Sequence, residues 1–142
     1  MTILAIPNVS EGRYKDFVSQ LCSAVNGAGS QVLDVHSDAV HNRCVLSVTA
    51  GSSGSLAGAM AALAAEASVI DLTAHVGVHP RLGGLDVCPF VSHTADMSEA
   101  LGAAESAAAL IGGEAGLPVY LYGASARRPE TKELPDLRRG GL

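Results

Sequence analysis

Residues 31–49, QVLDVHSDAVHNRCVLSVT, contain the pattern that decides the fold of this chain. Two stretches rich in β-branched and apolar residues, 31–36 and 43–49, are separated by the short polar segment SDAVHN. Two such runs with a short link are typical of a β-hairpin. The sequence therefore predicts two neighbouring strands that pair with each other.

A helix is predicted on each side of this hairpin. Before it, Phe17, Leu21 and Val25 recur at four-residue spacing, which indicates an amphipathic helix that ends near residues 26–27. Ser10 is the expected N-cap of this helix. After the hairpin, residues 55–68 carry a second apolar stripe.

Further strands are predicted over residues 2–7 and 85–91. The order of strand, helix, hairpin, helix and strand is the βαββαβ order of a ferredoxin-like α+β fold. A third helix, stopped by Gly112 and Gly113, and a strand over residues 118–122 extend it. We expect a mixed sheet with helices on one face, and a cover on the other face because the strands are apolar on both sides.

Length and composition indicate one domain over residues 1–142, with a polar tail over residues 124–142. The net charge of −5 argues against a nucleic-acid-binding surface. The chain shows no signal peptide and no apolar run that could span a membrane. The three cysteines form no CxxC pair, which favours reduced thiols in a cytoplasmic protein over a zinc knuckle.

Residues 73–84 form a long irregular segment rich in histidine and glycine, and such loops often carry function. Pro80 favours an extended backbone at His79, whose imidazole can accept and donate protons at neutral pH. Arg81 suits a carboxylate, Gly77 allows a ligand to approach the backbone, and Asp86 could orient a histidine or hold a cation. The alternative is that His75 and His79 are ordinary loop histidines.

Two other groups of polar residues allow a functional and a structural interpretation. His36, Asp38 and His41 are suitable metal ligands, but their spacing matches no known metal motif, so hydrogen bonding within a turn is the simpler explanation. In PNVSEGR, residues 7–13, Asn8 and Ser10 could bind an anion or a polar substrate group. A strand end followed by a helix cap explains the same pattern.

Four segments in this order resemble the N-terminal subdomain of the glutamate formiminotransferase family: PNVSEGR (7–13), LDVHSDAVHNR (33–43), HVGVHPRLGGLDVCPF (75–90) and PVYLYG (118–123). The resemblance implies transfer of a formimino group from N-formimino-L-glutamate to tetrahydrofolate, a step of histidine degradation and one-carbon metabolism. It also implies that the inner face of the sheet meets a second subdomain. The expected partners are small-molecule substrates and either a companion C-terminal-subdomain chain or further copies of this chain, without nucleic acid or membrane.

The resemblance places the family's catalytic histidine at His79, which would act as general base and then as general acid. No metal is expected in the site. Together with the residues singled out above, the candidate contacts to substrate or folate are Asn8, Ser10, Asn42, Arg43, His75, Gly77, Arg81 and Asp86.

Two positions depart from the family pattern: Val78 replaces a frequent glutamate, and His36 replaces an acidic residue. Val78, together with a length that matches only the N-terminal subdomain, motivates a second hypothesis, a catalytically incomplete subunit that binds folate or a partner and needs a second chain. A third hypothesis is a metal-dependent hydrolase of a related amidine, with His36, Asp38, His41 and His75 as ligands.

Overall fold

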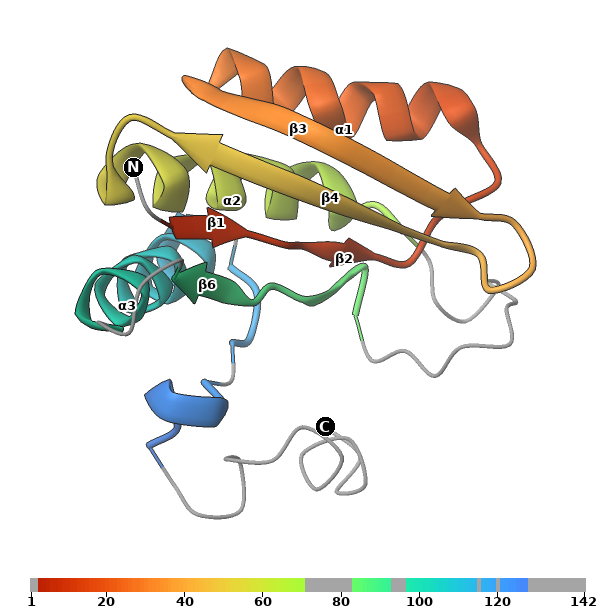
Figure 1. Ribbon diagram of the computed structural model, residues 1–142. Helices are drawn as coiled ribbons and strands as arrows, with labels where there is room; N and C mark the ends of the chain where they lie inside the picture. The colour runs from red at the N-terminus through yellow and green to blue at the C-terminus, as the bar shows by residue number, and fades with distance from the viewer. Residues whose placement is uncertain (1–2, 71–82, 93–96, 115, 120, 128–142) are drawn as a thin grey trace.

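The computed structural model of the chain describes residues 3–70, 83–92, 97–114, 116–119 and 121–127. In chain order its elements are β1 (Ile3–Ala5), β2 (Asn8–Val9), α1 (Lys15–Gly27), β3 (Ser30–Asp38), β4 (Arg43–Ala50), α2 (Ser53–Ala67), β5 (Leu85–Val87), β6 (Phe90–Ser92), α3 (Ser98–Glu114) and the short 3-10 helix η1 (Gly123–Ser125). Figure 1 shows them arranged as one curled sheet with helices beside it.

The strands form one sheet in which every described pair is antiparallel, so the prediction of a mixed sheet was wrong for the described strands. The hairpin partner β3 lies beside β4, and β4 pairs with both β1 and β2. On their other side, β1 pairs with β6 and β2 pairs with β5. From one edge of the sheet to the other, the order is β3, then β4, then β1 and β2 end to end, then β5 and β6 end to end. This is the ferredoxin-like strand order, and it confirms the predicted α+β fold and its hairpin.

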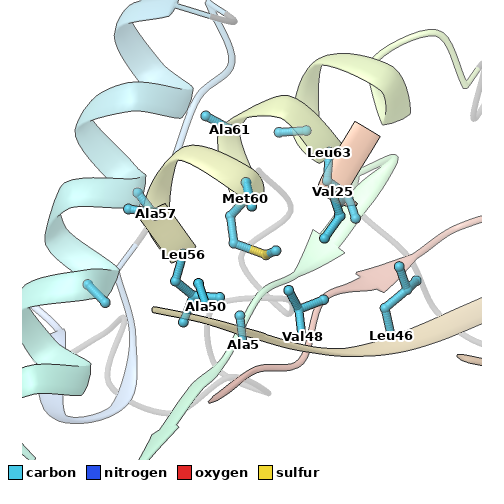
Figure 2. Packing of buried hydrophobic residues seen from close by; sticks show 14 of the residues in the cluster. Ala5, Val25, Leu46, Val48, Ala50, Leu56, Ala57, Met60, Ala61 and Leu63 are labelled. Atoms are coloured by element: carbon cyan, nitrogen blue, oxygen red, sulfur yellow. The ribbon is translucent and has the colours of Figure 1, made fainter. Parts of the chain in front are cut away.

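The hydrophobic core lies between the sheet and the helices. Ile3 and Ala5 of β1 are fully buried, as are Leu46 and Val48 of β4, because alternate side chains of a strand point to the same face. Helix α2 contributes Leu56, Met60 and Leu63 from the opposite side. Figure 2 shows the Met60 side chain extending from α2 towards Ala50 and Val48.

The opposite face of the sheet carries no helix in the described part of the chain (Figure 1). Several of its apolar side chains are only half-buried, among them Leu4 of β1, Ile6 directly after β1 and Val45 of β4. Val91, which lies opposite Leu4 in β6, is 40% exposed. A cover for this second face stays a prediction.

The predicted N-cap of α1 was wrong. The helix follows Tyr14, which makes no capping hydrogen bond through its side chain. The carboxylate of Glu11 instead accepts hydrogen bonds from the amides of Arg13 and Tyr14, at 2.9 and 3.1 Å. Ser10 is engaged elsewhere, because its hydroxyl donates to the carbonyl oxygen of Gly83.

The predicted end of α3 and the strand after it were also wrong for the described residues. The helix continues through Gly112 and Gly113 to Glu114, because a glycine inside a helix costs only about 1 kcal/mol. It is followed by Gly116 at φ +67° and by a 3.4 Å hydrogen bond from the amide of Leu117 to Ile111. Residues 117–119 and 121–122 adopt no strand.

Among the residues that the structure describes, no helix combines the length and the apolar character that a bilayer crossing requires.

Candidate active site

The link between β3 and β4 is built around Asn42. Its φ of 53° lies in the left-handed region, which asparagine adopts more readily than most residues. Its side-chain oxygen accepts a 2.9 Å hydrogen bond from the amide of Gly12. Only glycine fits there, because a Cβ at Gly12 would lie 2.3 Å from the carbonyl oxygen of Arg43. The loop after β2 is therefore packed directly on the start of β4.

Arg43 begins β4 and pairs with Asp86 of β5. Its Nη1 lies 3.0 Å from Oδ2 of Asp86, and the two side chains are 7% and 1% exposed. Its Nη2 donates a 3.3 Å hydrogen bond to the side-chain oxygen of Asn8 in β2, the strand between them. Buried charges are costly to remove from water, so each depends on the other to remain in this position.

One donor of this cluster is not satisfied. Nη1 of Arg43 lies within ion-pair distance of Asp86, but none of its N–H bonds meets a described acceptor with hydrogen-bond geometry. The charge attraction depends on distance, whereas a hydrogen bond also depends on direction. Unsatisfied buried donors are uncommon in native proteins and often mark functional positions.

Ser10 follows β2 and is fully buried. Its hydroxyl donates a 2.7 Å hydrogen bond to the carbonyl oxygen of Gly83, and its amide donates one of 2.8 Å to the carbonyl oxygen of Gly84. Asn8 lies two residues earlier and donates through its amide group to the carbonyl oxygen of Ile6. Through these bonds the PNVSEGR segment holds the chain that leads into β5.

Four of the predicted site residues, His75, Gly77, His79 and Arg81, lie outside the described residues. The two flanks of segment 71–82 are described and lie together. The amide of Ile70 donates to Ala67 at the end of α2, and a Cβ at Gly84 would lie 2.3 Å from the same carbonyl oxygen. Both ends of the segment therefore join the fold beside Ser10.

The structure brings the other predicted residues to one end of the sheet. Asn8, Arg43 and Asp86 are in contact, Asn42 precedes Arg43, and Ser10 bonds to the glycines before β5. Glu11 was not among the predicted site residues; it is 5% exposed, and its carboxylate accepts hydrogen bonds from the amides of Arg13 and Tyr14 in the loop before α1. The sequence also did not predict that Gly12 and Gly84 pack closely against neighbouring backbone. Their position beside polar motif residues was the only sequence feature that could have indicated it.

Asp38 and His41 pair at the tip of the hairpin. Oδ2 of Asp38 lies 2.8 Å from Nδ1 of His41, and the side chains of His41 and Asp38 are 46% and 39% exposed. The other oxygen of Asp38 accepts from the amides of Val40 and His41. The hydrogen bond from the His41 amide, followed by that to the His41 ring, holds the pKa of Asp38 below its usual value. The carboxylate is thus occupied within the turn.

The described residues provide no metal-binding cluster for the hypothesis of a metal-dependent hydrolase. Within the described ranges, no group of three histidine, cysteine or acidic side chains is placed to hold a metal ion. His36 lies on β3 opposite Val45. His75, the fourth ligand of that hypothesis, lies outside the described residues.

The cysteines are poorly suited to act as nucleophiles. All three, Cys22, Cys44 and Cys88, are free thiols. Burial raises the pKa of Cys88 to about 12, and burial, more than neighbouring charges, raises the pKa of Cys44 to about 12. Because the thiolate is the reactive form, both remain neutral and unreactive near pH 7.

A cavity of about 570 Å³ borders the polar cluster. Its walls are residues 83–90, which include Asp86, the alanine-rich side of α3, and the segment with Leu117, Leu121 and Tyr122. This volume lies in the range of small-molecule pockets. This cavity could not be predicted from the sequence, because the alanines that leave this space carry no chemical pattern.

The chain matches the family described as the formiminotransferase domain, N-terminal subdomain, over residues 2–142. It is 38% identical over 135 residues to a glutamate formimidoyltransferase of Thermoplasma acidophilum and 39% identical over 138 residues to one of Streptococcus pyogenes serotype M1. It is also 37% identical over 137 residues to a formimidoyltransferase-cyclodeaminase of Sus scrofa.

These matches cover 94–95% of this chain, but 45%, 46% and 25% of the three relatives. The chain therefore spans about half the length of the two transferases and a quarter of the cyclodeaminase. Because the match extends over nearly the whole chain and includes every segment of the polar cluster, the chain belongs to the formiminotransferase family and corresponds to its N-terminal subdomain.

Proposed function

We propose that this chain takes part in the transfer of a formimino group from N-formimino-L-glutamate to tetrahydrofolate. The observation that carries the proposal is the convergence of Asn8, Asn42, Arg43 and Asp86 at one end of the sheet. The two ends of segment 71–82, which contains the other candidates, join the fold at the same place. The names of the relatives, glutamate formimidoyltransferase among them, support the reaction type.

In the proposed reaction, the secondary amine N5 of tetrahydrofolate attacks the formimino carbon and forms a carbon–nitrogen bond. His79 removes the proton of the attacking nitrogen. It returns that proton to the glutamate nitrogen as the bond between this nitrogen and the formimino carbon breaks. One imidazole can perform both steps because its ordinary pKa of about 6.5 lies near neutral pH. Tetrahydrofolate is a co-substrate and leaves with the formimino group.

The remaining candidates bind or orient the substrates in this proposal. Both substrates carry carboxylates, which suit the guanidinium of Arg81 and the polar groups at Asn42 and Arg43. Asn8 and Asp86 offer further polar contacts, with Asp86 held in place by Arg43. His75 and Gly77 complete the set from within segment 71–82.

A second candidate function is a catalytically incomplete subunit that binds folate or a partner. It is favoured by the face of the sheet on which the described residues place no helix, where Leu4, Ile6 and Val45 are only half-buried and Val91 is 40% exposed. A companion C-terminal-subdomain chain or a second copy would cover this face, since apolar surface is stabilised by removal from water. The free thiols support a cytoplasmic location for either function.

The test of the proposed function is a formimino-transfer assay on His79→Ala, with His41→Ala as the control. His41 is an exposed histidine of the hairpin tip and has no role in the proposal. We expect His79→Ala to abolish transfer without lowering the melting temperature, and His41→Ala to retain activity. Transfer by His79→Ala would contradict the proposal.

Light scattering tests the second candidate. An inactive wild-type chain that self-associates would favour the incomplete subunit. A strictly monomeric chain that is active alone would exclude it.

A further inference from the structure

Three side chains from three neighbouring strands form one row across the sheet. Asn8 of β2 lies opposite Val45 of β4, and Val45 in turn lies opposite His36 of β3 on its other side. Residues that lie directly opposite each other in antiparallel strands have their side chains on the same face. His36 therefore shares a face of the sheet with Asn8, which is part of the polar cluster.

This row belongs to the face on which the described residues place no helix (Figure 1). In β4, Cys44 and Leu46 are fully buried in the core, whereas Val45 and Ser47 are half-buried and point the other way. The outer face, as we call it, thus carries His36, Val45 and Ser47 beside the polar cluster. Ser47 is a diagonal neighbour of His36, because it lies two residues from Val45 on the same strand.

The charge of Arg43 is directed away from β3. Its guanidinium contacts Asn8 in β2 and Asp86 in β5, and β3 lies on the opposite side of β4 from these strands. Arg43 is also the only arginine or lysine in the six described strands, and the carboxylate of Asp86 offsets its charge. An anionic group that binds on the outer face over β3 and β4 therefore needs another donor.

His36 is the only histidine in the six described strands, and its side chain is exposed. A neutral imidazole has one N–H group and a charged one has two, so the ring can donate to a carboxylate. Asp34, which lies opposite Ser47 on the same face, can accept from one nitrogen of the charged ring while the other N–H group donates to a ligand. The hydroxyl of Ser47 offers a further donor.

We infer that His36 binds a carboxylate of the formimino donor. The inference rests on the proposed function, in which that donor is a dicarboxylic amino acid derivative, and it adds a contact that favours this class of substrate. Two strand spacings, about 10 Å in all, separate His36 from Asn8. An elongated small molecule can therefore lie across the half-buried Val45, with one end at the polar cluster and a carboxylate at His36.

His41 provides a matched control for His36. Both are exposed histidines of the same hairpin. The ring of His41, however, lies at the tip, with its Nδ1 2.8 Å from Oδ2 of Asp38. His41 is outside β3 and β4, so it does not belong to the row with Val45 and Asn8. A ligand on the outer face should contact the ring of His36 and not that of His41.

The experiment follows the ring resonances of the histidines by NMR while the wild-type chain is titrated with L-glutamate, the product that retains both carboxylates of the donor. The signals of His36 and His41 are assigned by their loss in His36→Gln and His41→Gln. We expect saturable shifts for His36 and none for His41. Unshifted His36 signals, or equal shifts of the two rings, would overturn the inference.

Variants then measure how much the contact contributes. His36→Leu should raise the Kd for L-glutamate and the KM for N-formimino-L-glutamate about tenfold or more, because a hydrogen bond to a charged group is lost. His36→Gln retains an amide donor and should recover part of this loss, whereas His41→Leu should leave both constants unchanged. A Kd of His36→Leu equal to that of the wild type would also overturn the inference.

These outcomes are distinct from those that decide the proposed function. A wild-type chain whose His36 signals shift with L-glutamate but which transfers no formimino group would defeat the proposed function and leave the carboxylate site in place. A chain that is active in transfer but whose His36 signals do not shift would overturn this inference alone.

Discussion

Two side-chain pairs, the Arg43–Asp86 ion pair and the His41–Asp38 contact, lie at the same end of the β3–β4 hairpin and differ mainly in burial. Arg43 and Asp86 are 3.0 Å apart with side chains 7% and 1% exposed. His41 and Asp38 are 2.8 Å apart with side chains 46% and 39% exposed. The distances are similar, but the first pair joins separate strands, whereas the second closes a turn within three residues of the chain.

This difference shows that distance alone is a poor guide to the importance of a charge pair. An exposed pair loses little when one partner is removed, because water replaces it. A buried pair leaves an uncompensated charge when it is broken. We therefore expect the end of the sheet with Arg43 and Asp86 to determine both the stability and the shape of the candidate site.

The largest effect is expected from Arg43→Ala. The change removes the buried ion pair with Asp86 and the hydrogen bond to Asn8, and should lower the free energy of unfolding by about 3–5 kcal/mol. Urea denaturation measures it. The double variant Arg43→Met with Asp86→Leu should regain most of this loss, because it removes both buried charges of the pair. A loss below about 1 kcal/mol for Arg43→Ala would remove the contrast between the two pairs.

A smaller effect is expected from Gly12→Ala. The new methyl group would lie 2.3 Å from the carbonyl oxygen of Arg43, so backbone must move, at a cost of about 1–3 kcal/mol. Gly58→Ala is the control, because a Cβ at Gly58 in α2 meets nothing within 4 Å. That variant should be more stable than the wild type by up to about 1 kcal/mol, since alanine favours a helix. Equal melting temperatures for the two variants would show that the loop does not pack closely on β4.

The smallest effect is expected from Asp38→Asn at the hairpin tip. The pKa of Asp38 lies below its ordinary value of 3.8 because of the amide and ring of His41. The pKa of this carboxyl is lower in the folded protein than in the unfolded chain. Its ionised form therefore stabilises the fold above the unfolded-state pKa, and this stabilisation disappears as the pH falls through the folded-state pKa. The small difference in melting temperature between the wild type and Asp38→Asn should therefore be present at pH 7 and vanish in acid. A difference that grows in acid would contradict this assignment.

Much of the fold followed from local patterns. The hairpin over residues 31–49, the helices on either side of it and the order of the strands were confirmed, because each depends on apolar spacing that the sequence displays directly. The end of α3 and the segment around Pro118 were not predicted correctly. There, the bond from Leu117 to Ile111 and the left-handed Gly116 determine the path of the chain.

The sequence named several residues that the structure brings together, but it did not show how they are connected. Asn8, Arg43 and Asp86 were chosen for their chemistry, and the structure places them in contact. That Ser10 holds Gly83, instead of capping α1, could not be read from the sequence, since the two residues are 73 positions apart. Long-range contacts of this kind depend on the register of the whole sheet.

The most direct test of the central claim is a calorimetric titration of the chain with 5-formyl-tetrahydrofolate, a stable analogue of the loaded folate. We expect saturable binding by the wild type, unchanged binding by His41→Ala, and clearly weaker binding by His79→Ala. Absence of binding by the wild type, or equal loss in the two histidine variants, would contradict the assignment of the folate site to the buried polar end of this sheet.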